Sequence, residues 1–316
     1  MALNYDAIHS LTKKKYLPKL VDNFFKSNPF LAVLKEKQQA FDGGPSIIEP
    51  LIYGSLSHIK SYSMYDTVSY DQTTPVTAAE FRPKNVVAPL IISKDEELQN
   101  MGENQVLSLL ESKIQIAEET LKSSMTAMLY GDGTGNAGKD ITGLRAAIAA
   151  TGVYGGIDRA TNAWWNAYVS ANAGVPAALT FNRMLKVFLA ISDGNDQPTM
   201  LLCGNQTWAT YHELIRGSAQ LTSELSKKMA GMGFQTLEFM GKPVLADPSC
   251  PEGEIYFINE KYMKLRHHKA ANFTTTPFRQ ADDMIAKKQE ILWTGNLTFN
   301  NMRRQGVLKD ITLVTL

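Results

Sequence analysis

The strongest pattern in the chain is a helical one between Asn104 and Tyr130. Its apolar side chains recur at spacings of three and four residues and form one continuous stripe: Leu107, Leu110, Ile114, Ala117, Leu121, Met125 and Met128. Asn104 is a suitable N-cap, and Gly131 is a suitable stop. The pattern predicts a helix about 39 Å long. Such a rod is typical of a thin, flat subunit rather than of a compact domain.

A second pattern, with a period of two, runs from Leu56 to Tyr70 between the turn pair Gly54-Ser55 and the turn cluster Asp71–Pro75. One face of this predicted strand is rich in serine and threonine, and the other is aromatic with charges among the rings. We expect the chain to return through Phe81 and the apolar run 86–92, which would make a two-armed ribbon with arms about 40–50 Å long.

An isolated hairpin of that length is marginal in water, so we expect another subunit to cover it. The candidate subunit-interface residues lie on the ribbon, on its approach and in the N-terminal segment: Phe30, Tyr53, Leu56, His58, Tyr62, Met64, Tyr65 and Tyr70.

Residues 1–40 combine seven lysines and three acidic residues with apolar side chains that cluster near Phe24 and Phe30. The pair Asn28-Pro29 is expected to break any helix there. The segment is either a solvated amphipathic terminus or an arm. An arm would dock its aromatic side chains on another subunit and turn its lysines toward an anionic partner such as DNA or an acidic scaffold.

The rest of the chain mixes helices and strands without a βαβ rhythm, which predicts the α+β fold class. Residues 181–192 are expected to form a helix with Met184, Leu185, Phe188 and Leu189 facing inward. The expected helix 207–215 and seven short apolar strands follow the same reasoning: 200–203, 244–246, 255–258, 262–266, 290–299 and 307–316, with 47–53 nearer the N-terminus.

Composition excludes several classes of protein. The chain has 316 residues and a net charge of +1, so nothing predicts a dedicated nucleic-acid binder. Cys203 and Cys250 are too few for a disulfide framework or a four-thiolate zinc site. No apolar run approaches 20 residues, and Met1–Ser10 has no signal-peptide pattern, so we expect a soluble protein of a reducing compartment without membrane contact.

Candidate chemistry is sparse. Residues 133–138 spell the dinucleotide fingerprint G-x-G-x-x-G, but a predicted helix precedes them where the fingerprint needs a strand, so a turn is the better interpretation. A calcium loop starting at Asp132 would need a glutamate where Gly143 stands. We therefore expect no catalytic, metal or cofactor site, and a nucleotide-binding enzyme that uses Gly133–Gly138 stays only as an alternative.

Several segments together resemble the major capsid (coat) proteins of tailed bacteriophages, with the Hong Kong phage-type fold. They occur in the family's order: the strand and helix entry Lys84–Glu97, the helix exit Met128–Gly135 (MLYGDGTG), the following Ile141–Leu144 (ITGL), then Phe239–Val244 (FMGKPV), Gly253–Phe257 (GEIYF) and Asn300–Gln305 (NNMRRQ).

The resemblance implies five segments: an N-terminal arm (1–44), strands and an extended two-stranded E-loop (45–90), a peripheral domain with a spine helix (91–150), an axial domain (151–270) and return strands (271–316). It implies many copies assembled as pentamers and hexamers into an icosahedral head around double-stranded DNA, made in the host bacterial cytoplasm. A scaffolding protein, a portal and a decoration protein are the implied partners. The same-fold alternative is an encapsulin-type nanocompartment shell.

Overall fold

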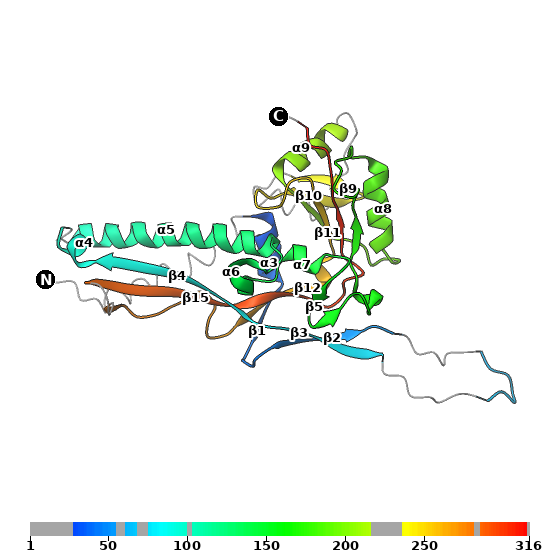
Figure 1. The fold of residues 1–316 in the computed structure, drawn as a ribbon, viewed down its shortest axis with the longest axis horizontal. Coiled ribbons are helices and arrows are strands. Elements are labelled where there is room, and N and C mark those ends of the chain that lie inside the picture. Colours follow the sequence, from blue (N-terminus) through cyan, green and yellow to red (C-terminus); the bar gives the residue numbers. More distant parts are fainter. Residues whose placement is uncertain are drawn as a thin grey trace.

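The computed structural model describes residues 28–54, 61–67, 75–99, 103–215, 236–280 and 285–314. It is a mixed helix and sheet structure built on two six-stranded sheets. In Figure 1, a limb made by the long helix α5 and two long strands extends to the left, and the second sheet with its helices rises on the right. A loop projects from the base at the lower right.

The first sheet is organised around one long strand. Its members are β1 (Gln38–Phe41), β4 (Lys84–Ser93), β12 (Met263–His268), β13 (Thr274–Thr275), β14 (Arg279–Gln280) and β15 (Ala286–Phe299). The order is β1-β12-β15-β13, with β14 and β4 also paired to β15. β4 runs antiparallel to β15 from the pair Ser93 and Ala286 to the pair Lys84 and Gly295, and this ribbon forms the floor of the limb.

The predicted long helix is confirmed as α5 (Glu103–Tyr130), and α4 (Lys94–Gln99) precedes it. α5 lies along β4 (Figure 1) and buries the stripe that the sequence predicts, at Ile114, Ala117, Leu121 and Met125. The opposing side chains of β4 are Val86, Ala88, Leu90 and Ile92. The helix ends at the predicted stop, where the amide of Gly131 donates to the carbonyl oxygen of Ala127 at 3.0 Å.

The second sheet has the order β7-β16-β11-β8-β10-β9. Its strands are β7 (Tyr168–Ser170), β8 (Met200–Cys203), β9 (Thr236–Phe239), β10 (Lys242–Ala246), β11 (Ile255–Ile258) and β16 (Gly306–Leu308). All residues of β8 and β11 are buried, because α8 (Phe181–Ile191) and α9 (Asn205–Leu214) belong to the core on one face and the main core lies on the other. Such strands read as continuous apolar runs.

Short elements connect these layers. They are α6 (Gly135–Gly138), α7 (Leu144–Ala147), the 3-10 turns η2 (Ala163–Trp165) and η3 (Glu260–Tyr262), and the pair β5 (Val153–Tyr154) and β6 (Ile157–Asp158). Two details differ from the sequence predictions. Leu189 is 60% exposed, because Val187 and Ile191 complete the buried stripe of α8. The closing strand 307–316 shortens to β16.

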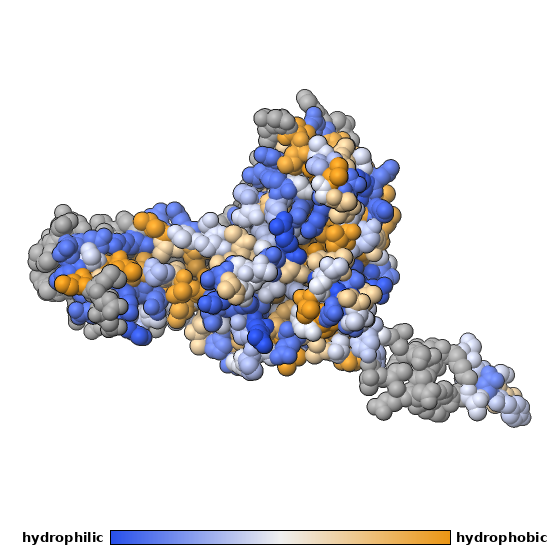
Figure 2. All heavy atoms as spheres, in the orientation of Figure 1, coloured by the Kyte–Doolittle hydropathy of each residue, from blue (hydrophilic) through white to orange (hydrophobic). Residues whose placement is uncertain are grey.

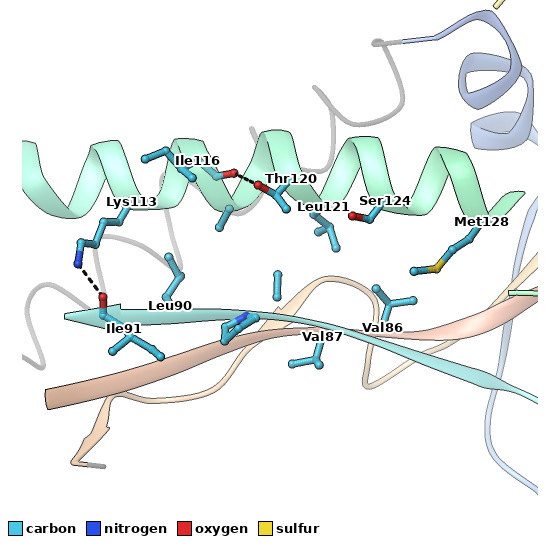
Figure 3. Close-up of a pocket in the computed structure, with 13 residues that line it drawn as sticks. Val86, Val87, Leu90, Ile91, Lys113, Ile116, Thr120, Leu121, Ser124 and Met128 are labelled. Carbon is cyan, nitrogen blue, oxygen red and sulfur yellow. Dashed lines mark hydrogen bonds between the residues drawn. The ribbon is translucent and has the colours of Figure 1, made fainter. Parts of the chain in front are cut away.

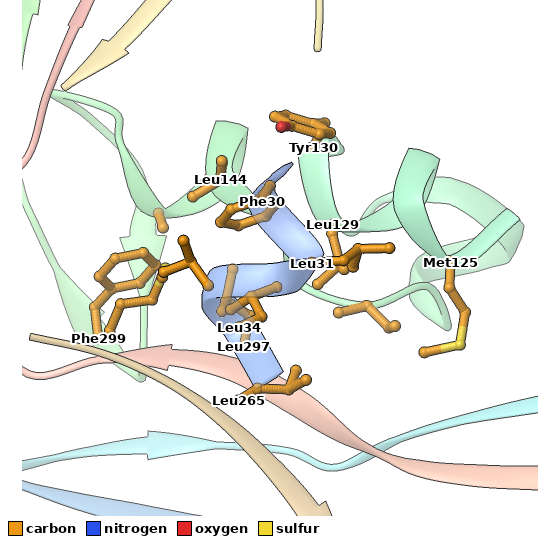
Figure 4. Close-up of a cluster of buried hydrophobic side chains, with 14 of the residues drawn as sticks. Phe30, Leu31, Leu34, Met125, Leu129, Tyr130, Leu144, Leu265, Leu297 and Phe299 are labelled. Carbon is orange, nitrogen blue, oxygen red and sulfur yellow. The ribbon is translucent and has the colours of Figure 1, made fainter. Parts of the chain in front are cut away.

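The N-terminal segment corrects the sequence prediction from residue 28 onward. Pro29 does not break a helix but begins α3 (Pro29–Glu36), since the first turn needs no amide from that residue. Phe30, Leu31 and Leu34 of this helix are completely buried among Leu129, Tyr130 and their neighbours (Figure 4). Phe30 therefore belongs to the core of its own subunit, and its assignment as a subunit-interface residue is wrong.

The ribbon is also shorter than predicted. β2 (Ile47–Ile52) pairs with β3 (Val76–Phe81), and the run 86–92 leaves the ribbon to join β15 as β4. A turn lies at Ser63–Asp66, where the amide of Asp66 donates to the carbonyl oxygen of Ser63 at 2.9 Å and the amide of Ser63 donates to Asp66 Oδ2. The expected turn cluster 71–75 lies outside the described residues except for Pro75. A turn at residues 63–66 therefore interrupts the single strand predicted for residues 56–70.

Candidate assembly surfaces

A buried carboxylate anchors the base of the projecting hairpin. Glu49, on the inner face of β2, is completely buried and accepts hydrogen bonds from Arg266 Nε at 2.5 Å, Lys264 Nζ at 3.0 Å and Thr298 Oγ1 at 3.3 Å. Burial alone would raise the pKa of Glu49, but the two cations outweigh it, so the pKa lies below its usual value. The cluster of one carboxylate and two cations thus fixes β2 of the hairpin to β12 of the first sheet.

Close packing holds the other side of the hairpin base. Gly155, at φ +58°, follows β5, and its carbonyl oxygen accepts the amide of Glu80 at 2.9 Å. A Cβ at Gly155 would lie 2.9 Å from side-chain atoms of Ala79 and Phe81, so only glycine allows this approach. Phe81 packs edge-on against Tyr154 at 5.0 Å between ring centres. The hairpin therefore leaves the subunit in a fixed direction.

The tip of the hairpin carries large apolar side chains without cover. Tyr62, Met64 and Tyr65 are 76%, 86% and 94% exposed. The described tip, residues 61–67, lies at the end of the molecule farthest from the limb of α5 (Figure 1). Three such side chains in one turn are typical of a contact surface.

The other predicted interface residues do not lie at the tip as the structure describes it. Tyr53 is half-exposed and stacks on Trp164 of its own chain, with 4.9 Å between ring centres. Leu56, His58 and Tyr70 lie outside the described residues. The structure thus brings Tyr62, Met64 and Tyr65 together at the tip and places Tyr53 at the base.

The sequence analysis missed an apolar surface on the outer face of the hairpin base. Ile48, Ile52 and Val76 are 62%, 82% and 60% exposed, and Ile52 and Val76 are cross-strand neighbours. The inner face of β2 holds the buried Ile47, Glu49 and Leu51. The sequence did contain an indication of this surface. A half-buried strand needs one apolar face for its own core, and β2 has isoleucine on both faces.

Side chains of α5 and β4 line a groove of about 550 Å³ (Figure 3). It is lined by Val86, Val87, Ala88, Pro89, Leu90, Ile91, Lys113, Ile116, Ala117, Thr120, Leu121, Ser124 and Met128. Figure 2 shows apolar side chains among polar ones on this limb. The Lys113 ammonium group is engaged, because it donates to the Ile91 carbonyl oxygen at 2.7 Å and contacts Glu96 at 2.6 Å. The side chains that remain available for contact in the groove are therefore mostly apolar.

A buried polar junction joins three parts of the chain. Asp247, after β10, is completely buried and accepts hydrogen bonds from the Tyr130 hydroxyl at 2.8 Å, Asn28 Nδ2 at 3.3 Å and the Ser249 amide at 2.9 Å. Burial raises the pKa of Asp247. Burial also raises the pKa of the nearby Cys250 thiol, which disfavours the reactive thiolate.

Comparison with known proteins decides the family. A sequence model described as SU10 major capsid protein matches residues 93–312, most of the chain. The chain belongs to the SU10 major capsid protein family. No curated protein matches it at the level of sequence.

Solved capsids share the fold of this SU10-family protein. A capsid chain of cyanophage A-1(L) superimposes with a TM-score of 0.74 at 18% identity, covering 92% of this chain and 94% of that chain. The capsid of Myoviridae phage XM1 gives a TM-score of 0.56 at 10% identity, with 85% and 87% covered. The SrpI encapsulin of Synechococcus elongatus PCC 7942 also gives 0.56, at 14% identity, with 100% and 99% covered.

These findings make the chain a major capsid protein with a structural role, as the resemblance implied. The phage assignment is better supported than the nanocompartment one, since the matching sequence family is a capsid family and the cyanophage capsid has the higher TM-score. A capsid protein is a component of the virion. Among the described residues, no helix has the length and apolarity needed to cross a membrane.

The glycine motif of this capsid protein has a packing explanation. The loop 133–138 follows α5, so it lacks the preceding strand of a dinucleotide site. Within the loop, Gly133 has a φ of +78° and packs so closely on the following segment that a Cβ would lie 3.1 Å from Thr142 Cα. Gly143 of that segment lies against the end of α5, where a Cβ would approach the carbonyl oxygens of Leu129, Met128 and Gly131 to 2.4–2.6 Å. The motif closes the helix end rather than forming a phosphate cradle.

Proposed function

We propose that copies of this capsid protein assemble as pentamers and hexamers into an icosahedral head around double-stranded DNA, and that the hairpin of each copy is an E-loop covering a neighbour. The observation that carries this proposal is the nearly complete exposure of Met64 and Tyr65 at the tip of a firmly anchored hairpin. Burying such side chains stabilises a contact by roughly 1.5–3 kcal/mol each.

The position of the tip favours rings. The tip and the limb of α5 lie at opposite ends of the subunit (Figure 1), so a tip that reaches a second copy touches a surface unlike itself. Head-to-tail contacts of this kind generate closed rings when the rotation closes. A ring of five or six copies is the expected unit of the shell.

We propose the same division of the subunit that the resemblance implies. Residues 91–150 with the return strands 271–316 form the peripheral domain, 151–270 form the axial domain, 45–90 carry the E-loop, and 1–44 form the arm, except that α3 joins the core. The core cluster around α8 and α9 supports this division, because its buried members lie within residues 151–270 apart from Leu308 and Ile311.

The proposed partners follow from the chemistry of a shell. A near-neutral chain suits non-specific contact with packaged DNA, which must be repositioned during packaging. A scaffolding protein, a portal and a decoration protein would complete the head, with assembly in the host bacterial cytoplasm. Terminase and portal genes beside this gene support a phage head, and a cargo enzyme gene would instead support a nanocompartment.

Electron microscopy of the expressed protein, alone and with its scaffold, tests the proposal. We expect closed particles or five- and six-membered rings. A strictly monomeric protein under every assembly condition would contradict it.

Deleting residues 57–73 separates folding from assembly. Because β2 and β3 are anchored from below by Glu49 and Phe81, the shortened subunit is expected to fold and stay soluble but to form no particles. Circular dichroism and electron microscopy measure the two properties. Loss of the fold itself would show that the loop belongs to the subunit's own core.

A further inference from the structure

The groove between α5 and β4 is apolar and open. Three of its lining residues expose much of their surface: Ile116 is 64%, Val87 56% and Ile91 45% exposed. Along β4 the exposed Val87 and Ile91 alternate with buried side chains that face α5, such as Leu90 (Figure 3). Lys113 is already paired with Glu96. The groove thus suits a row of apolar side chains more than a charged ligand.

The chain enters the described structure beside one end of this groove. Asn28 and Tyr130 both donate to the carboxylate of Asp247, and the rings of Phe30 and Tyr130 lie 5.3 Å apart. Met128, one helical half-turn before Tyr130, lines the groove. Residues that precede Asn28 therefore start next to the groove, at the C-terminal end of α5.

Residues 16–25, which lie outside the described residues, have the sequence that such a groove requires. Their apolar side chains come in pairs every four residues: Tyr16, Leu17, Leu20, Val21, Phe24 and Phe25. This spacing places the pairs on one face of a helix, with Pro18 tolerated in a first turn. The groove between Met128 and Lys113 is about 22 Å long at the helical rise, so the ten residues 16–25, about 15 Å long as a helix, fit within it.

We propose that residues 16–25 of the same chain occupy the groove, with Leu20, Val21, Phe24 and Phe25 against α5 and β4. The lysines at positions 19 and 26 then face solvent. A tether that begins at the end of the groove holds the segment at an effective concentration in the mM range, which favours the chain's own segment over that of a neighbour. The inference does not depend on shell assembly.

Cysteine accessibility in the unassembled full-length chain tests the proposal. Ile116→Cys introduces a thiol in the groove, while the native Cys203 and Cys250 are buried and contribute little background. We expect the double change Leu20→Asp and Phe24→Asp to increase the maleimide reaction rate at this thiol about tenfold, as the groove changes from mostly filled to mostly open. Asn23→Asp, a like charge off the apolar face, is expected to leave the rate unchanged.

A thiol at Leu189→Cys on α8 controls for unfolding, because its reaction rate should not respond to any of these changes. Equal rates at Ile116→Cys in parent and double variant, or parallel increases at both thiols, would overturn the proposal.

Photo-crosslinking gives a second readout that keeps the chain aromatic. With benzoylphenylalanine in place of Phe24, irradiation of the dilute subunit should give products within one chain, on residues 86–91 or 113–128. Products between chains, or on other segments, would overturn the assignment.

Discussion

At the scale of single residues, two buried carboxylates behave in opposite ways. Glu49 faces two cations, which keep its pKa below 4.5 despite burial. Asp247 has no cation beside it among the described residues and depends on three hydrogen-bond donors, so burial raises its pKa. The first ties the hairpin to β12, and the second joins the end of α5 to the segment that follows β10.

Replacing Glu49 with glutamine should destabilise the subunit by about 3 kcal/mol, because Arg266 and Lys264 lose the carboxylate that they share while remaining partly buried. Urea unfolding measures the change. Glu80→Gln on the exposed face of the same hairpin is the matched control and should change the free energy of unfolding by less than about 0.5 kcal/mol. Equal effects would show that the buried pair does not anchor the hairpin.

Glu49 also predicts a pH dependence. A carboxyl group with a lowered pKa in the folded state stabilises the fold above its ordinary value of 4.5, and this contribution disappears as the pH falls through the folded pKa. The free energy of unfolding should therefore fall more steeply below about pH 4.5 in the parent than in Glu49→Gln. Parallel pH profiles of the two proteins would contradict the assigned charge state.

At the scale of elements, the sequence pattern predicted those elements whose structure depends on interactions between residues close together in the chain. α5 could be recognised because one apolar stripe repeats over about six turns, and its end because Gly131 follows at once. α3 was missed because it has eight residues and begins at a proline, a residue that also ends helices. β4 was assigned to the ribbon because only a pairing with β15, about 200 residues away in sequence, distinguishes the two arrangements.

Leu31→Ala tests the revised position of α3. A completely buried leucine leaves a cavity, so the free energy of unfolding should fall by about 3 kcal/mol. Leu189→Ala on the exposed face of α8 is the control, and it should lower the free energy of unfolding by less than about 0.5 kcal/mol. Chemical denaturation compares both with the parent, and similar small effects would return α3 to the arm.

At the scale of the whole molecule, the hairpin carries apolar surfaces that the rest of the described chain leaves exposed. The exposure of Tyr62, Met64 and Tyr65 could be predicted because the pattern around them suits no core. The exposed apolar face at the hairpin base could not, because only the structure shows which face of β2 is buried. Both surfaces lie on the same hairpin, so one neighbouring copy can cover them together.

Changing Tyr62, Met64 and Tyr65 together to serine should abolish particle formation while changing the free energy of unfolding by less than about 1 kcal/mol, since these side chains touch solvent in the isolated subunit. Sedimentation velocity and urea unfolding separate the two effects. Assembly at the parent level would remove the tip from the interface.

The most direct measurement is a cryo-electron microscopy structure of the assembled particle, read at the hairpin tip. We expect Met64 and Tyr65 to be buried against a neighbouring copy, with the base still held by Glu49. A hairpin that folds back on its own subunit, or that stands free in solvent in the finished shell, would contradict the account.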